Sequence, residues 1–256
     1  MNKAERQQRI LEYIISHNKS ASMEELKRYC GVTSETIRKD LIEMEQQKKV
    51  CRVLGGAVLY ERTGERLLQN RFYENLSAKR EIAAAAARLI CEKDLICLDS
   101  GSTNLCFAMN FPQVSASVLT NSLNIAQELA QRKDVRVFVA GGELREKNMS
   151  MTGASAESTV RSYLVRKAFI TSEGVDLDFG IMDAHESESR VKQAMISISK
   201  EVYLLADHSK FTVMTPICTA SLDKLTAIIT DSAVDPQILA QYAKAGVRII
   251  VADPLR

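Results

Sequence analysis

Four short segments in the second half of the chain combine small, hydroxylated and amide residues in a way that suits the capture of an anionic ligand. Each segment directly follows a run of apolar residues, and the first also opens a predicted helix. Backbone N–H groups and hydroxyls at a helix N-terminus favour a negatively charged group, typically a phosphate. The segments are Asp99-Ser100-Gly101-Ser102-Thr103, Thr120-Asn121-Ser122, Gly141-Gly142 and Asp207-His208-Ser209-Lys210-Phe211, and the last one adds a cation.

These segments form one site only if the fold brings them together. Singly, such clusters after a strand are usually caps and turns. From Ser77 onward, however, short apolar strands alternate with helices, which favours an α/β domain with a mostly parallel sheet covered on both faces. Ligands bind at the carboxyl ends of the strands in such a sheet, so four segments at that edge favour a pocket. We expect strands near residues 95–98, 118–120, 135–140, 168–171, 202–206, 227–229 and 247–251, and helices over 77–91, 122–131, 155–164, 190–200 and 236–244.

The N-terminal sixty residues have a different organisation, in which three helices are expected. Apolar residues recur at helical spacing over residues 3–17. An S-x-x-E capping box at Ser22 then begins a short helix over 22–29. Gly31 stands where a helix end favours a positive φ, and Thr33 caps a third helix over 34–48.

A hairpin follows these helices. Two β-prone runs, residues 50–53 and 57–60, flank Leu54-Gly55-Gly56, and a Gly-Gly pair between such runs is a hairpin signal. Helix, short helix, glycine turn, longer helix and hairpin together predict a winged helix-turn-helix. We expect it to occupy residues 1–60, with a linker over 61–76 and the α/β domain over 77–256.

In this motif the third helix lies in the DNA major groove with its N-terminal residues toward the base edges. The residues placed to contact DNA are Ser34, Glu35 and Thr36 in the first turn, Arg38 and Lys39 one turn later, and Arg52 in the wing. Taken alone, Arg38 and Lys39 would be ordinary solvated charges on a helix. The glycine turn, the capping signals and the hairpin together favour contacts with phosphates and base edges instead.

Composition excludes several classes of protein. No apolar run approaches the roughly 20 residues of a membrane helix, and the polar N-terminus is unlike a signal peptide. We therefore expect a cytoplasmic protein that does not bind membranes. The six cysteines form no C-x-x-C pair and have no histidine at a ligand spacing, so we expect no disulfides, no metal and no cofactor. Residues 1–62 hold 12 Lys/Arg and 9 Asp/Glu, an excess that fits nucleic-acid binding.

The stretch VTSETIRKDLIEMEQQKKVCRVLGGAVL closely resembles the signature of the DeoR family of bacterial transcription regulators, a V-S-x-x-T-I-R-R-D-L helix followed by an R-x-H-G-G-A wing. The matching residues are Val32, Thr33, Thr36, Ile37, Arg38, Asp40, Leu41, Arg52, Gly55, Gly56 and Ala57. The resemblance adds Gly55 and Gly56 to the expected DNA-binding residues. Lys39 replaces the second arginine and loses its bidentate readout, while Leu54 stands where histidine is common. Both departures bear on the operator sequence rather than on DNA binding itself.

The resemblance continues through the second domain, where DSGST, TNSLNIA, GGELR, EGVD and DHSKF look like the sensor domain of the same family. That domain is similar in fold to ribose-5-phosphate isomerase, and in the family it senses phosphorylated sugars or related metabolites. The resemblance implies an effector site of Asp99, Ser100, Gly101, Ser102, Thr103, Thr120, Asn121, Gly141, Gly142, Asp176, Lys192 and Lys210. Arg145 is a further candidate. Glu186 and Glu188 lie either near the mouth of the pocket or in solvent at the start of a helix.

An isomerase-like fold raises the question of catalysis. Aldose–ketose isomerisation needs a carboxylate base and a partner that stabilises the enediolate, and Asp176 and Lys192 could take these parts. The segment GVDLDFG, however, departs from the D-G-A-D-E run of the isomerases, and similarity of fold licenses no activity. Cys97, Cys106 and His208 show no arrangement of nucleophile and base. We therefore expect binding without turnover, and no enzyme.

These features predict a transcriptional regulator, in the first instance a repressor of a sugar or sugar-alcohol catabolic operon. Its partners would be double-stranded operator DNA and a phosphorylated sugar or sugar-alcohol effector that relieves repression. Because two half-sites are read with matched symmetry, we expect a homo-oligomer, either a dimer or a tetramer. Two alternatives stay open: an activator of the same type, and a sugar-phosphate isomerase with an N-terminal appendage.

Overall fold

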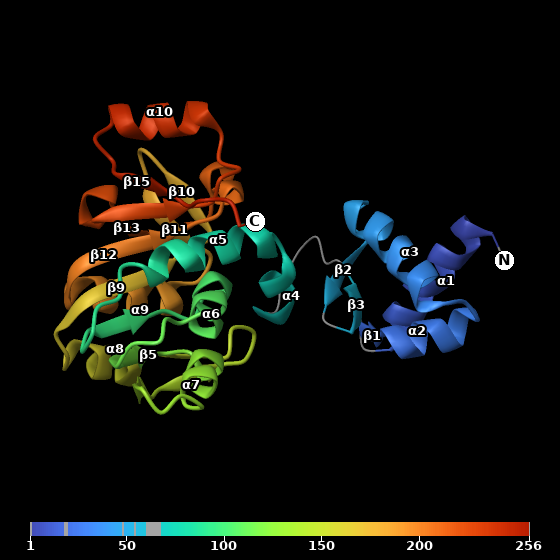
Figure 1. The fold of residues 1–256 in the computed structure, drawn as a ribbon, viewed down its shortest axis with the longest axis horizontal. Coiled ribbons are helices and arrows are strands. Elements are labelled where there is room, and N and C mark those ends of the chain that lie inside the picture. Colours follow the sequence, from blue (N-terminus) through green and yellow to red (C-terminus); the bar gives the residue numbers. More distant parts are fainter. Residues whose placement is uncertain (1, 18–19, 48, 54, 60–67, 256) are drawn as a thin grey trace. The chain divides into compact units, whose positions relative to one another are not determined.

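The computed structural model describes residues 2–17, 20–47, 49–53, 55–59 and 68–255. The chain divides into two compact units, Met1–Glu74 and Asn75–Arg256, whose elements are labelled in Figure 1. Each unit contains its own cluster of buried hydrophobic residues. The expected order of an N-terminal helix-turn-helix unit and a mostly parallel α/β unit is confirmed.

Three helices and a small sheet make up the N-terminal unit. The helices are α1 (Lys3–Ser16), α2 (Met23–Cys30) and α3 (Ser34–Gln46). Their bounds agree with the predicted helices to within two residues, since caps at Ser22 and Thr33 mark the starts of α2 and α3. Ile10, Leu26 and Leu41, one from each helix, meet in the core of this unit because each helix turns an apolar stripe inward.

The wing is an antiparallel sheet in the order β1-β3-β2, formed by β1 (Ser20–Ser22), β2 (Val50–Val53) and β3 (Gly56–Leu59). Strand β1 was not predicted, because three residues are too few to show a strand periodicity. Of the predicted linker, residues 61–67 lie outside the described part of the chain. Residues 68–73 form helix α4 (Leu68–Tyr73), which packs against β2.

A seven-stranded parallel sheet forms the C-terminal unit, in the order β15-β14-β12-β9-β4-β5-β6. All seven strands were predicted, with ends that shift by up to three residues. They are β4 (Leu95–Leu98), β5 (Ala116–Thr120), β6 (Val135–Val139), β9 (Val165–Thr171), β12 (Ser199–Leu205), β14 (Ala227–Thr230) and β15 (Ile249–Val251). In chain order this is a doubly wound arrangement, in which the direction of winding reverses between β4 and β9.

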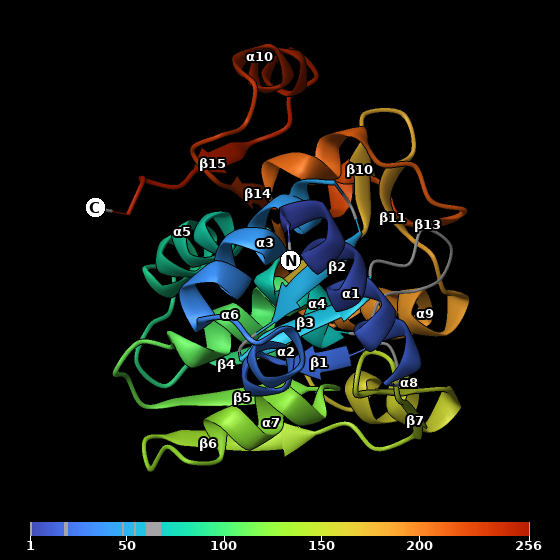
Figure 2. The ribbon, with the colours of Figure 1, turned by 90° about the vertical axis from the view of Figure 1, so that its right-hand side faces the viewer.

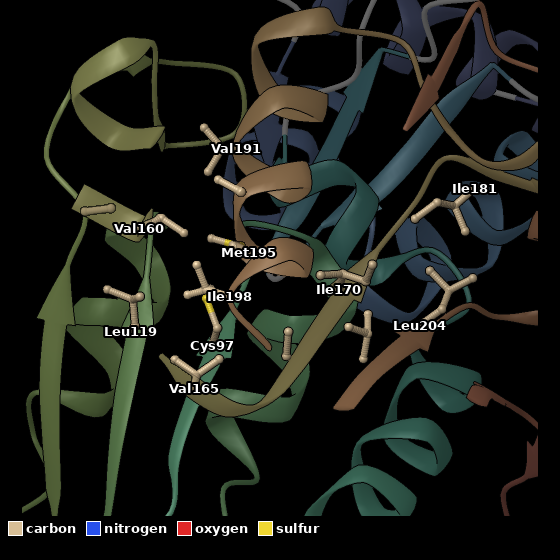
Figure 3. Packing of buried hydrophobic residues seen from close by; sticks show 14 of the residues in the cluster. Cys97, Leu119, Val160, Val165, Ile170, Ile181, Val191, Met195, Ile198 and Leu204 are labelled. Atoms are coloured by element: carbon tan, nitrogen blue, oxygen red, sulfur yellow. The ribbon is translucent and has the colours of Figure 1, made fainter. Parts of the chain in front are cut away.

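Helices cover both faces of the sheet. On one face lie α5 (Leu76–Ala87), α6 (Ser102–Met109) and α7 (Leu123–Leu129), and α5 and α6 run side by side in Figures 1 and 2. On the other face lie α8 (Ala154–Arg161), α9 (Glu186–Ser197) and, beyond them, α10 (Pro236–Lys244). Figure 3 shows Val191 and Met195 of α9 among strand side chains such as Cys97 and Ile170. Close packing of these side chains holds α9 against the strands.

The C-terminal unit also contains two smaller sheets, which were not predicted. One is the hairpin of β7 (Glu143–Arg145) and β8 (Ser150–Thr152); the other joins β10 (Gly174–Asp176), β11 (Gly180–Asp183) and β13 (Ile217–Ala220). Two 3₁₀ turns, η1 (His208–Thr212) and η2 (Leu222–Lys224), complete the unit. None of the helices in the described part of the chain has the length and apolar character that crossing a membrane requires.

Candidate functional site

Helix α3 is fixed on one side and open on the other. Thr33 caps its N-terminus, since its hydroxyl accepts a hydrogen bond from the N–H of Thr36 at 3.3 Å. Glu35, Arg38 and Lys39 are exposed. The guanidinium of Arg38 lies 3.4 Å from Glu35 and 63% of its side chain is exposed, so this pair is weak and the arginine can exchange partners. The outer face of α3 thus offers the expected residues to a ligand, with Ser34 and Thr36 partly buried beside them.

The inner side of α3 contains a residue whose role sequence reasoning missed. Asp40 is buried, and its carboxylate accepts hydrogen bonds from the Nε and, at 3.1 Å, the Nη2 of Arg6 in α1. The ion pair raises the pKa of Arg6, mainly through its hydrogen bond to Asp40. A signal was present in the sequence, because Asp40 shares the helix face of Ile37, Leu41 and Met44, where a lone carboxylate needs a buried partner.

The wing residues have structural partners as well. The backbone N–H and the Nε of Arg52 each donate to Glu45 of α3 at 2.8 Å, so this arginine ties the wing to α3. Gly55 has a φ of 83°, which suits the turn. A Cβ on Gly56 would lie 2.1 Å from the carbonyl oxygen of Ala21, so only glycine lets β1 approach β3 here. Leu54 lies outside the described residues.

In the C-terminal unit, the Asp99–Thr103 loop lies at the switch point between β4 and β9. Asp99 is buried and accepts hydrogen bonds from the N–H and hydroxyl of Thr171 at 3.0 Å and from Asn104 at 2.6 Å. A Cβ on Gly101 would lie 1.9 Å from the Thr171 hydroxyl, so glycine is required for the loop to pack against the end of β9. Gly101 is the N-cap residue of α6 and has no side chain that could cap the helix. The backbone N–H groups of Ser102 and Thr103, in the first turn, therefore receive no side-chain cap from it.

Lys192 of α9 joins this loop through a buried cluster of charges. Its ammonium pairs with Asp183 at the end of β11 and lies 3.5 Å from Asp99. Burial alone would lower the pKa of Lys192, but attraction to Asp183, Asp99 and Glu188 outweighs burial and raises it. Asp183 also accepts a hydrogen bond from Thr219 at 2.7 Å. The lysine is therefore charged and held in place, with carboxylates on several sides.

Glu188 extends the cluster toward the β7–β8 hairpin. It accepts hydrogen bonds from Asn148 and, at 3.0 Å, from Ser150, and Arg145 lies 3.5 Å away. Burial would raise the pKa of Glu188, but Lys192, Asn148 and Arg145 hold it below its ordinary value. Glu188 is thus a buried anion, so the alternative of a solvated acid was wrong for this residue. That alternative is correct for Glu186, which is exposed and pairs with Arg190.

A second charged group surrounds Asp207 at the end of β12. The carboxylate accepts hydrogen bonds from the N–H of Ser209 at 3.0 Å and from the Asn75 amide at 3.1 Å. Burial would raise the pKa of Asp207, but Lys210, Ser209 and Lys79 outweigh burial and lower it. Sequence reasoning missed Lys79, which is buried in α5. No pattern distinguished it from the solvated charges common in an alanine-rich helix.

The other expected residues lie at the ends of β5 and β6, which follow β4 in the order of the parallel sheet, or, in the case of Asp176, in a separate small sheet. Thr120 ends β5 and Asn121 follows it, and the Thr120 hydroxyl accepts a hydrogen bond from the N–H of Ser122 at 3.1 Å. Gly141 and Gly142 connect β6 to β7. Asp176 lies in the β10–β11 turn, where its carboxylate accepts from two backbone N–H groups, of Asp178 at 2.8 Å and Phe179 at 3.1 Å. Among the described residues, the carboxylates paired with Lys192 are those of Asp183 and Asp99, and Asp176 is not one of them.

Three buried polar atoms near the ends of β4, β5 and β9 have no hydrogen-bond partner in the described part of the chain. They are the amide oxygens of Asn104 and Asn121 and the hydroxyl of Ser172. Buried polar groups are nearly always hydrogen-bonded, so such atoms call for a partner. Within the same part of the chain, no three His, Cys, Asp or Glu side chains are grouped as metal ligands. The unpaired atoms suit the hydroxyl groups of an organic ligand.

Comparison with known proteins extends these observations to the whole chain. Residues 6–63 match the model of the DeoR-like helix-turn-helix domain, and residues 74–232 match that of the DeoR C terminal sensor domain. In Bacillus subtilis (strain 168), an uncharacterized HTH-type transcriptional regulator, YulB, is 36% identical over 91% of this chain and 90% of its own length. The HTH-type transcriptional repressor GlcR of the same organism is 31% identical over 99% and 98%.

The relatives also include an activator, and comparison with solved structures gives distant matches. The L-fucose operon activator of Haemophilus influenzae is 31% identical over 93% of this chain and 96% of its own length. Ribose 5-phosphate isomerase A of Methanocaldococcus jannaschii is 15% identical, with 52% of this chain and 53% of that chain covered and a TM-score of 0.39. The two matching domain models and the similarity to these regulators over nearly the whole chain establish that this chain belongs to the DeoR family of transcriptional regulators.

Proposed function

We propose that this regulator is a repressor of a carbohydrate catabolic operon and that a phosphorylated sugar or sugar alcohol relieves the repression. One observation carries the proposal. The same chain contains an exposed face of α3 and a buried cluster of charges at the switch point between β4 and β9. Relatives named as repressors, such as GlcR, support repression rather than activation. Because one relative is named as an activator, activation of the operon is the second candidate function.

The chemistry of the switch point supports a ligand with both a phosphate and hydroxyl groups. Uncapped N–H groups at the start of α6 suit a phosphate, and Lys210 and Lys79 lie near Asp207 at the same edge. The unpaired amide oxygens of Asn104 and Asn121 suit the hydroxyls of a sugar. Asp99, Asp183 and Glu188 add negative charge to the site. This charge disfavours the binding of an anion that has no hydroxyl groups to donate hydrogen bonds to these carboxylates. The proposed ligand is therefore a phosphorylated polyol rather than a simple anion.

We infer binding without turnover. An isomerase needs a carboxylate free to take a proton from its substrate. Asp176, the base expected for such a reaction, accepts two backbone N–H groups within its own turn. Lys192 is buried between carboxylates, which favours a structural and electrostatic part in ligand binding. Turnover of pentose or hexose phosphates by the protein, lost in Asp176→Asn, would contradict this inference.

In the proposed mechanism, the effector acts on the spacing of two DNA-binding units in a homo-oligomer. Operator half-sites have a fixed separation, so operator affinity depends on how the two units are held. An effector that binds one arrangement more tightly shifts the equilibrium toward it by the difference in affinity. A gel shift with the DNA upstream of the gene, with and without sugar phosphates, tests the proposal. No specific shift, or a shift indifferent to every sugar phosphate, would exclude it.

Replacing Arg38 by alanine should weaken operator binding by about 1–3 kcal/mol if the guanidinium contacts a base edge. The side chain is exposed and its partner Glu35 is also exposed, so the change should leave the fold intact. Quantitative gel shifts at fixed salt measure the effect. Arg190→Ala is a matched control, because Arg190 is an exposed helical arginine paired with a glutamate of its own helix. Equal affinity of the Arg38 variant and the wild type would place this residue among the solvated charges.

Replacing Lys210 by alanine should leave operator binding unchanged and remove the response to the sugar. A lost charged hydrogen bond weakens effector binding by about 1.5–3 kcal/mol, or roughly tenfold or more. Calorimetry with the inducing sugar phosphate, and gel shifts with and without it, give the two values. Lys244→Ala on α10 is the control for an exposed lysine of the same unit. If the Lys210 variant loses operator binding as well, the residue has a folding role instead.

A further inference from the structure

Asn75 is the first residue of the sensor unit and lies between helices α4 and α5. Its φ of 50° and ψ of 38° place it in the left-handed region, which asparagine tolerates better than most residues. The chain passes from one unit to the other at this residue, so any change in the backbone torsions of residue 75 changes the path of the connection. A contact that holds this residue therefore bears on how the two units are connected.

The side chain of Asn75 is not used to cap its own helix. As the N-cap residue of α5 it makes no side-chain cap hydrogen bond. Its amide nitrogen donates instead to the carboxylate of Asp207 at 3.1 Å and to the hydroxyl of Ser209 at 3.3 Å. Both acceptors are 132 or more residues away along the chain, directly after strand β12. The helix start is thus bonded to the loop that carries Lys210.

Asp207 is the centre of this loop and has several competing partners. It is buried, it accepts from Ser209 and Asn75, and Lys210 and Lys79 attract it. An anionic group that binds at this edge would compete for the same donors and cations. It would also repel the Asp207 carboxylate at short range. Ligand binding and the Asn75–Asp207 hydrogen bond are therefore expected to oppose each other.

We propose that Asn75 is a positioning residue that couples the effector loop to the DNA-binding unit, held by Asp207 in the ligand-free protein and released when an anionic group binds beside Lys210. The proposal rests on the proposed function, because it assigns the Lys210 loop to the effector site. Release frees the side chain and lets the left-handed turn at residue 75 relax. The backbone torsions at residue 75, through which the chain passes from one unit to the other, are then free to change.

Hydrogen–deuterium exchange of the full chain tests this coupling, with inorganic phosphate and several sugar phosphates as the probes. The reporters are the amides of α4 and the Lys79 amide, which donates to the Asn75 carbonyl at 3.0 Å. In the wild type, phosphate should speed their exchange roughly tenfold, the factor expected for the loss of one such hydrogen bond. Asn75→Gly keeps the left-handed turn but lacks the amide. It should exchange at the faster rate without phosphate and show no further change with it.

Controls separate coupling from a structural role. Asn110→Gly removes another asparagine amide at a helix end of the same unit, one that donates to Cys106, and should respond to phosphate like the wild type. Calorimetry establishes whether inorganic phosphate or any of several sugar phosphates binds each variant. Binding to the wild type without faster exchange in α4 and at Lys79 overturns the coupling and leaves the proposed function intact. No binding of any phosphate compound contradicts the effector site itself, and the coupling with it.

Discussion

Replacing Lys192 by methionine is expected to lower the free energy of unfolding of the sensor unit by about 3–5 kcal/mol at neutral pH, the usual loss when one partner of a buried ion pair is removed. Methionine fills a similar volume but leaves the buried carboxylates of Asp183, Asp99 and Glu188 without their cation. Chemical denaturation monitored by circular dichroism measures the loss, because the chain contains no Trp whose fluorescence could report unfolding.

The pH dependence gives this prediction its sharpest form. In the wild type the pKa of Glu188 is lowered from 4.5, so its stabilising contribution is present above that value and is lost as the pH falls below it. The pKa of Lys192 is raised from 10.5, so its contribution is complete below that value and is lost only at more alkaline pH. Without the cation the carboxyl groups protonate more readily.

The difference between the Lys192→Met variant and the wild type should therefore shrink as the pH is lowered from neutral toward about 5, because protonated carboxyl groups no longer repel one another. Lys200→Met, at an exposed position just after the same helix, should show little loss at any pH. A loss for the Lys192 variant that is the same at pH 5 and at pH 8 would show that packing, not charge, holds the cluster.

Replacing Asp40 by alanine should abolish operator binding by unfolding the DNA-binding unit. The change removes a buried carboxylate that accepts two hydrogen bonds from Arg6, and the expected loss is about 3–5 kcal/mol. A unit of this size has a small core and little stability to spare. Differential scanning calorimetry of the full chain should show a lower melting temperature for the N-terminal unit and an unchanged one for the sensor unit.

A double replacement distinguishes the ion pair from a DNA contact. Arg6→Met with Asp40→Leu removes both charges and should restore much of the stability, because apolar residues often replace a buried ion pair without loss. Glu35→Ala, at an exposed acid of the same helix, should leave the melting temperature unchanged. Normal melting of the Asp40→Ala variant together with lost operator binding would instead assign Asp40 to the DNA contact.

Local features of the sequence determined most of the N-terminal unit. Helical periodicity, the caps at Ser22 and Thr33 and the left-handed Gly31 each depend on neighbours within a few residues, and the helices follow them closely. The same holds for the seven strands of the parallel sheet, whose apolar runs are mostly buried in β4, β5, β9, β12 and β14 and more exposed in the edge strands β6 and β15. Strand β1 and the two small sheets escaped prediction because their short strands mix polar and apolar residues and contain no continuous apolar run.

The candidate site shows where local information ends. The alternation of strands and helices predicted that Asp99, Gly101 and Lys210 follow strands at one edge of a parallel sheet, because parallel strands end at the same edge, and the family resemblance added Lys192. The sequence did not determine their partners. Only the tertiary structure decided that Lys192 pairs with Asp183 and Asp99 while Asp176 is used within its own turn.

The same division explains the residues that sequence reasoning missed. Glu188 bonds to residues 38 and 40 positions away, Arg6 to a residue 34 away, and Asn75 to one 132 away. A charged side chain in a helix has the same local pattern whether it faces water or a buried partner. The sequence therefore determined the family, the two units and the sheet edge. The three-dimensional packing alone decided which charges are buried and paired, because pairing depends on which distant segments the sheet brings together.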